Sequence, residues 1–138
     1  MRVLVDTSVW SLALRRRHVS RGGLESKLGD ELGELIREGR AGIIGPIRQE
    51  LLSGLADDTQ FGRLRDQLRA FPDEPLLSED FESAGRISNR CRRAGLSGSP
   101  VDYLICAVSL RCTWAIFTTD NDFGQYSEVV PLELYTPR

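Results

Sequence analysis

The chain has 138 residues, 41% of them hydrophobic and 28% charged, with a net charge of −2, a composition that suits one soluble globular domain over residues 1–138. No apolar run approaches the ~20 residues that a bilayer crossing needs. The N-terminal run also reaches a carboxylate at Asp6 too early for a secretion signal. We therefore expect a cytoplasmic protein with no membrane segment. The three cysteines match no zinc pattern and predict small buried side chains.

The first half of the chain alternates short apolar runs with helical patterns. In chain order it reads as strand, helix, helix, strand, helix and helix over residues 3–5, 9–14, 24–36, 43–44, 46–55 and 61–71. A polar break at 15–23 separates the first two helices. Gly39 suits the end of the second helix, and Pro46 suits the first turn of the third.

The second half continues the alternation. It reads as strand, helix, helix, strand and strand over residues 76–77, 78–91, 99–110, 114–117 and 129–135. The helix over 99–110 is apolar almost all round, which predicts a central, buried position. Pro131 makes the last strand an edge strand. Strands that alternate with helices predict an α/β fold of three α/β/α layers, with a central, mainly parallel sheet of four to five strands.

Four acidic residues lie where the chain passes from one element to the next, at Asp6, Glu50, Asp102 and Asp120. Ligands in open α/β sheets bind beyond the carboxyl ends of the strands. Asp6 and Asp120 each follow a strand, so both are expected at that edge. Asp102 lies in the first turn of the buried helix, and Glu50 borders the apolar stripe of its helix. At least three of these acids are therefore expected to meet.

Each acid also has a local structural alternative. Asp6 suits a helix cap, Asp102 suits a capping box with Ser99, Glu50 suits a solvated face, and Asp120 with Asp122 suits a turn. Carboxylates gathered without a partner would repel one another, and a bound cation removes that conflict. Because every donor is an oxygen, the set favours Mg²⁺ or Mn²⁺ over zinc. Such metals activate water and support in-line displacement at phosphorus.

Four segments resemble the PIN domain, specifically the VapC-type toxins of bacterial toxin–antitoxin pairs. They are V-L-V-D-T-S-V-W, I-R-Q-E-L-L-S-G, G-L-S-G-S-P-V-D-Y-L-I-C-A-V and F-T-T-D-N-D-F, and they span essentially the whole chain. The resemblance implies a PIN-like fold and a Mg²⁺-dependent ribonuclease. It gives catalytic roles to Asp6, Glu50, Asp102 and Asp120, with Asp6, Asp102 and Asp120 as metal ligands and Glu50 as an orienting group or base.

The resemblance also implies auxiliary residues. Ser8 and Thr118 match hydroxyl residues that orient ligands or substrate, and Asp122 is a possible fifth acid that competes with Asp120 for the fourth position. Two arginine clusters could contact RNA phosphates. They are Arg15, Arg16, Arg17 and Arg21, and Arg90, Arg92 and Arg93. A solvated helix end or loop is the alternative role for both clusters.

The implied partners are an RNA substrate, a cognate VapB-type antitoxin and a second copy of the chain. Two alternatives keep the fold but change the role: an RNA-processing PIN nuclease that has no antitoxin, and a non-catalytic binding module. A third is a haloacid-dehalogenase-like phosphatase, which also places an aspartate after its first strand. That chemistry needs a second acid two residues later, where this chain has Ser8.

Overall fold

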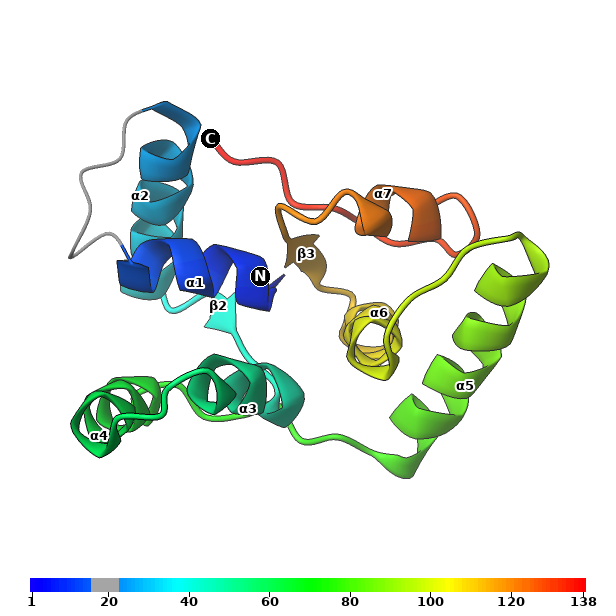
Figure 1. Cartoon of the computed structure of the whole chain (residues 1–138). Helices are drawn as coiled ribbons and strands as arrows, with labels where there is room; N and C mark the ends of the chain where they lie inside the picture. Colours follow the sequence, from blue (N-terminus) through cyan, green and yellow to red (C-terminus); the bar gives the residue numbers. More distant parts are fainter. Residues whose placement is uncertain (16–22) are drawn as a thin grey trace.

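In the computed structural model, residues 1–15 and 23–138 are described, and three short parallel strands lie at the centre (Figure 1). The strand order is β2-β1-β3, with β1 at Val3–Val5, β2 at Ala41–Gly42 and β3 at Ala115–Phe117. Val3 pairs with both Ala41 and Ala115. All residues of the strands are buried. Because the strands are parallel, their carboxyl ends meet at one edge.

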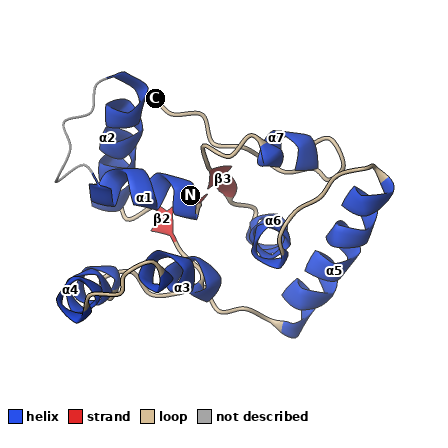
Figure 2. Ribbon diagram, viewed as in Figure 1, coloured by secondary structure: helices blue, strands red, loops and turns tan. Residues whose placement is uncertain are grey.

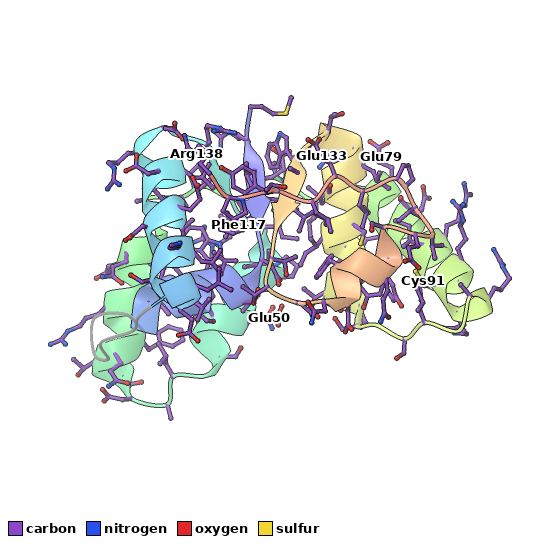
Figure 3. The ribbon with its side chains drawn as sticks, turned by 90° about the horizontal axis from the view of Figure 1, so that it is seen from above. Glu50, Glu79, Cys91, Phe117, Glu133 and Arg138 are labelled. Atoms are coloured by element: carbon purple, nitrogen blue, oxygen red, sulfur yellow. The ribbon has the colours of Figure 1, made fainter. Side chains whose placement is uncertain are left out.

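Helices make up most of the described chain (Figure 2). They are α1 (Thr7–Arg15), α2 (Gly23–Arg37), α3 (Gly45–Ser53), α4 (Asp58–Leu68), α5 (Ser78–Arg93), α6 (Pro100–Cys112) and α7 (Asp122–Tyr126). In Figure 3 the strands lie between α1–α4 on one side and α5–α7 on the other. This arrangement confirms the predicted α/β class, with a parallel sheet flanked by helices. Among the described helices, none has both the length and the apolar character of a membrane span.

The central position of α6 follows from its composition. Seven consecutive residues, Tyr103 to Ser109, are buried, so the helix packs on all sides, as its uniform apolar pattern predicts. Ser109 is the polar residue of this run, and its hydroxyl donates to the carbonyl of Trp114 at 2.6 Å. Thr113 ends the helix in the left-handed conformation (φ 56°). The chain then turns directly into β3, which carries it to the edge where Asp120 follows.

The sheet has three strands, where four to five were predicted. The apolar pair at 76–77 does not form a strand, because Leu77 precedes α5 and its N–H donates to the Asp80 carboxylate at 2.8 Å. Strand β2 occupies 41–42, and the predicted pair at 43–44 instead leads into α3. The predicted edge strand at 129–135 is reduced to one parallel bridge between Leu134 and Ile116. Pro131 has no N–H to offer a ladder.

Two regions differ from the prediction in other ways. Helix α7 was not predicted, since the T-T-D-N-D-F segment reads as a turn. Its presence explains the shortened last strand, because the N–H groups of Val129 and Val130 both donate to the carbonyl of Tyr126. Residues 16–22 of the polar break, with three arginines of the first cluster, Arg16, Arg17 and Arg21, lie outside the described residues.

Candidate acidic site at the carboxyl ends of the strands

Asp6 is the first residue beyond β1 and is only 7% exposed. Its N–H donates to the carbonyl of Phe117 at 2.9 Å, which joins the ends of β1 and β3. Its carbonyl accepts from Val9, so its backbone also begins α1. The side chain accepts two hydrogen bonds at one oxygen, Oδ2, from the hydroxyls of Ser8 (2.9 Å) and Thr118 (2.8 Å). The backbone of Asp6 therefore begins α1, while its side chain accepts from two hydroxyls.

Ser8 and Thr118 also hold the chain that follows β3. The Ser8 hydroxyl accepts from the N–H of Thr119 at 3.1 Å. The Thr118 hydroxyl accepts from the N–H of Asp120 at 2.9 Å. Each hydroxyl therefore donates to Asp6 and accepts from the backbone beside Asp120. Two acids that lie 114 residues apart in the sequence are positioned by the same pair of side chains.

Asp102 lies in the first turn of α6 and forms the predicted capping box. Its N–H donates to the Ser99 hydroxyl at 3.1 Å, and the Ser99 N–H donates to Asp102 Oδ2 at 3.4 Å. The hydroxyl of Tyr126 lies 3.1 Å from the same oxygen. Burial raises the pKa of Asp102, hydrogen bonds from Ser99 and Tyr126 oppose this, and repulsion from Asp120 adds to it. Asp102 is thus both a helix cap and a member of the acidic site.

Glu50 reaches the site from α3, and Figure 3 shows it near the point where the chain leaves the strands. The hydroxyl of Thr7 lies 3.4 Å from its Oε1. Glu50 is an exposed residue, but the protein around its carboxylate partly removes that group from water, which raises the pKa of Glu50, and repulsion from Asp6 and then from Asp102 raises it further. The three acids that were predicted at different elements therefore act on one another electrostatically.

Asp120 and Asp122 have different surroundings. Asp120 is half-buried, and its Oδ1 accepts from the N–H of Asp122 at 2.9 Å. The charge of Asp120 contributes to the raised pKa of Asp102. Asp122 is exposed in the first turn of α7, and its charge is one of several causes that raise the pKa of Tyr126.

Each of the four acids keeps one carboxylate oxygen that makes no hydrogen bond to the described residues. These oxygens are Asp6 Oδ1, Glu50 Oε2, Asp102 Oδ1 and Asp120 Oδ2. A buried carboxylate oxygen without a partner is costly, which makes Asp6 Oδ1 an unsatisfied acceptor. Four oxygens of this kind have the chemistry of a Mg²⁺ or Mn²⁺ ligand set.

Within the described part of the chain, no three His, Cys, Asp or Glu side chains lie in a position to hold a metal ion between them, so the acids form an open arrangement and not a closed cage. Mg²⁺ sites are commonly of this open type, since the ion keeps several waters and uses one or two carboxylates with substrate phosphates. The donor set therefore fits a cation that is only partly coordinated by protein. A closed cage around the ion is not what the side chains provide.

No local sequence pattern singles out Tyr126, although its hydroxyl lies beside Asp102 of the acidic site. Tyr126 is fully buried on α7. Its hydroxyl lies 3.1 Å from Asp102 and 3.3 Å from the carbonyl of Ser97. Gly98 packs against this hydroxyl so closely that a Cβ at Gly98 would collide with it and would lie 2.8 Å from the hydroxyl of Tyr103. The spacing of Phe123 and Tyr126, both buried, is the only sequence signal of the helix that carries it.

The second arginine cluster lies in the last turns of α5 and is exposed. Arg90 donates to the carbonyl of Val129 at 3.3 Å, so it also fastens the segment after α7. The short loop that follows α5 leads to Asp102 at the start of α6. In the first cluster, α1 ends at Arg15, whose side chain is outside the described part.

Comparison with known proteins agrees with this architecture. Two solved structures share the fold at 16% sequence identity: FitAcB from Neisseria gonorrhoeae, with a TM-score of 0.73 over 98% of this chain and 97% of that chain, and VapBC2 from Rickettsia felis bound to a DNA fragment from their promoter, with a TM-score of 0.75 over 98% of each. No curated protein matches the sequence. The family model described as "PIN domain" matches residues 3–129. The chain belongs to the PIN domain family, which has a nuclease fold.

Proposed function

We propose that this protein is a divalent-metal-dependent endoribonuclease of the VapC toxin type. The observation that carries the proposal is the environment of Asp6. Its carboxylate is buried, one oxygen is held by Ser8 and Thr118, and the other has no partner among the described residues. Partial removal from water, and then repulsion from Asp6 and Asp102, raise the pKa of Glu50, and a cation would relieve that repulsion.

The four acids have two proposed roles, metal binding for the aspartates and positioning or deprotonation of water for Glu50. Asp6, Asp102 and Asp120 would hold Mg²⁺ or Mn²⁺ with their free oxygens, either directly or through water, and the half-buried, electrostatically coupled position of Asp120 favours it over Asp122. When bound, the cation polarises a phosphate and lowers the pKa of a water. Glu50, which reaches the acids from α3, would orient that water or accept its proton as a general base.

The proposed partners rest on the family resemblance and on the similarity to the two solved structures. The similarity to VapBC2 supports an antitoxin partner, which we propose to be of the VapB type and to block the acidic site. We further propose an RNA substrate, a homodimer and a cytoplasmic location. The phosphatase alternative is disfavoured by Ser8, whose hydroxyl donates to Asp6 at 2.9 Å in the position where that chemistry needs an acid.

The test is to sequence RNA 5′ ends after induced expression of the wild type and of Asp102→Asn. The proposal expects a defined set of new ends with the wild type only, and expects co-expression of the cognate antitoxin to suppress them. The same ends with Asp102→Asn would remove the site assignment. Ends that persist with the antitoxin would favour an RNA-processing nuclease instead.

A further inference from the structure

A pocket of about 290 Å³ opens directly beside the acidic site, between α3 and the first turn of α6. Its lining is Pro46, Gln49, Glu50, Ser53 and Val101. We propose that this pocket binds one nucleobase of the RNA, next to the phosphate that is cleaved, and that Gln49 selects the base. This inference rests on the proposed ribonuclease function, and it adds a binding site for a defined part of the substrate.

The position of the pocket relates it to the reaction. Glu50 belongs both to the pocket lining and to the acidic site. Val101, on the other wall, directly precedes Asp102. A phosphate held at the acids would therefore bring the adjoining nucleoside to the mouth of this pocket. Its volume is sufficient for one base but not for a stretch of duplex.

The charge of the lining excludes a phosphate as the ligand. Among the described residues, no arginine or lysine lines the pocket, and the carboxylate of Glu50 is the one charged side chain in its lining. Arg48 lies on the same helix but is engaged elsewhere. It donates to Asp73 at 3.0 Å, to the carbonyl of Leu68 at 2.9 Å and to the carbonyl of Phe71. The pocket is thus suited to an uncharged part of the RNA.

The polar groups of the lining match the edge of a base. The amide of Gln49 makes no hydrogen bond within the described residues, and it offers both a donor and an acceptor. The Ser53 hydroxyl donates its proton to the carbonyl of Gln49 at 2.7 Å, so its oxygen remains an acceptor. Pro46 and Val101 supply apolar surface for the flat faces of a base. Sequence-specific recognition of single-stranded RNA uses hydrogen bonds of this kind to exposed base edges.

The first test measures binding without cleavage. The metal-free, full-length protein is titrated with adenosine, guanosine, cytidine and uridine, and separately with inorganic phosphate, while the side-chain amide resonances of its glutamines are followed by NMR. The proposal expects one or two nucleosides to shift the Gln49 amide, phosphate not to shift it, and Gln60 on α4 to stay unchanged. No shift with any nucleoside, or a shift with phosphate alone, would overturn the base assignment.

The second test measures specificity. Wild type, Gln49→Leu and the matched control Gln60→Leu cleave an unstructured RNA with randomised positions, and the base preference around each cut is determined by sequencing. Gln49→Leu should lower the preference at one position by a factor on the order of tenfold, whereas Gln60→Leu should keep it. A wild type that cuts RNA with a preference unchanged in Gln49→Leu would overturn the pocket alone. A wild type that cuts no RNA would refute the proposed function, and the nucleoside titration would still decide the pocket.

Discussion

Asp6 and Asp102 each use one carboxylate oxygen for hydrogen bonds with protein groups. Asp6 Oδ2 faces two hydroxyls, and Asp102 Oδ2 faces Ser99 and Tyr126. Each aspartate therefore has a single oxygen left for a cation, which suits the one-oxygen ligation that small octahedral Mg²⁺ accepts. Partners that fix a ligating carboxylate in this way commonly affect metal affinity by 10–100-fold.

Removal of the Tyr126 hydroxyl should weaken cation binding without unfolding the protein. In Tyr126→Phe the ring stays in the core, while Asp102 loses a hydrogen bond at 3.1 Å. We expect Mn²⁺ affinity, measured by electron paramagnetic resonance, to fall about tenfold. Tyr103→Phe is the matched control, because Tyr103 is also buried and its ring lies 5.5 Å from that of Tyr126. Equal Mn²⁺ affinity in Tyr126→Phe and Tyr103→Phe would contradict an orienting role for Tyr126.

The charged carboxylate of Glu50 is expected to lower the free energy of unfolding of the metal-free protein at neutral pH. The pKa of Glu50 is raised in the folded state by burial and by repulsion from Asp6. The folded state therefore holds a proton that the unfolded state has lost, and stability falls as pH rises through the window between these two pKa values. We expect Glu50→Gln to raise the Tm of the metal-free protein at pH 7, and the gain to vanish below about pH 4, under the ordinary glutamate pKa.

Exposed Glu82 on α5 provides the comparison for this change. Glu82→Gln should leave Tm close to that of the wild type at both pH values. Saturating Mg²⁺ should stabilise the wild type more than Glu50→Gln, because the cation removes the repulsion that the substitution has already relieved. A Tm of Glu50→Gln that equals or lies below the wild-type value in the absence of metal would refute this interpretation.

Helices α5 and α6 are joined by an ion pair between Asp80, which is buried, and Arg111, which is partly exposed. Asp80 is 1% exposed, and Arg111 donates to it at 2.7 Å and to the carbonyl of Pro75 at 3.1 Å. Burial alone would raise the pKa of Asp80, but hydrogen bonds from Arg111 and Leu77 hold it below its ordinary value. The ion pair therefore keeps Asp80 charged at the buried contact between α5 and α6.

Loss of Arg111 should be strongly destabilising. Arg111→Leu leaves the Asp80 carboxylate buried and unpaired, which costs about 3–5 kcal/mol of unfolding free energy. Urea denaturation measures this change. The double variant Arg111→Leu with Asp80→Leu should recover a large part of the loss, since it removes the unpaired charge. A single variant as stable as the wild type would show that the pair does not hold the two helices together.

The elements that the sequence predicted well are those with strong local signals. Helix α6 begins at Pro100 after a Ser99 cap and is apolar almost all round, so both its start and its burial could be predicted. The ends of β1 and β3 could be predicted because each strand is a short apolar run that stops at a polar residue. Asp6 could be selected because it directly follows β1, and Asp102 because it lies in the first turn of α6.

The elements that were missed depend on contacts between distant residues. Helix α7 has only five residues, too few for a helical period to be distinct from a turn. The pairing of Asp80 with Arg111 and that of Tyr126 with Asp102 join residues 31 and 24 positions apart, and no local pattern indicates them. The last strand was overpredicted because its β-favouring residues lie beside Pro131, which interrupts pairing.

The C-terminal segment connects β3 with helix α2 on the other side of the sheet. Leu134 bridges to Ile116 of β3, and the segment then reaches Glu31 of α2, which is 6% exposed. Glu31 accepts from the hydroxyl of Tyr135 at 3.2 Å and from the backbone and guanidinium of Arg138 at 2.7–3.0 Å. The strand that leads to Thr118 and Asp120 is thereby fastened to the opposite side of the sheet.

Glu31→Gln should loosen this connection selectively. The substitution removes the charge that Arg138 faces and replaces one acceptor oxygen with a donor. We expect faster hydrogen exchange at the N–H of Tyr135, which donates to Ile116 at 2.8 Å. The N–H of Val3 donates to the carbonyl of Arg40 and provides an internal reference whose exchange rate should not change. Unchanged exchange at Tyr135 would show that Glu31 does not hold the segment against β3.

We propose that the acids at the carboxyl ends of the strands form a metal-dependent ribonuclease site. The most direct measurement is the rate at which purified wild type and Asp6→Asn cleave RNA, with Mg²⁺, with Mn²⁺ and with a chelator. We predict cleavage by the wild type with either metal, its loss with the chelator, and a decrease of at least about 100-fold in Asp6→Asn, because a metal ligand is removed. Cleavage by Asp6→Asn at the wild-type rate, or cleavage that persists with the chelator, would contradict the claim.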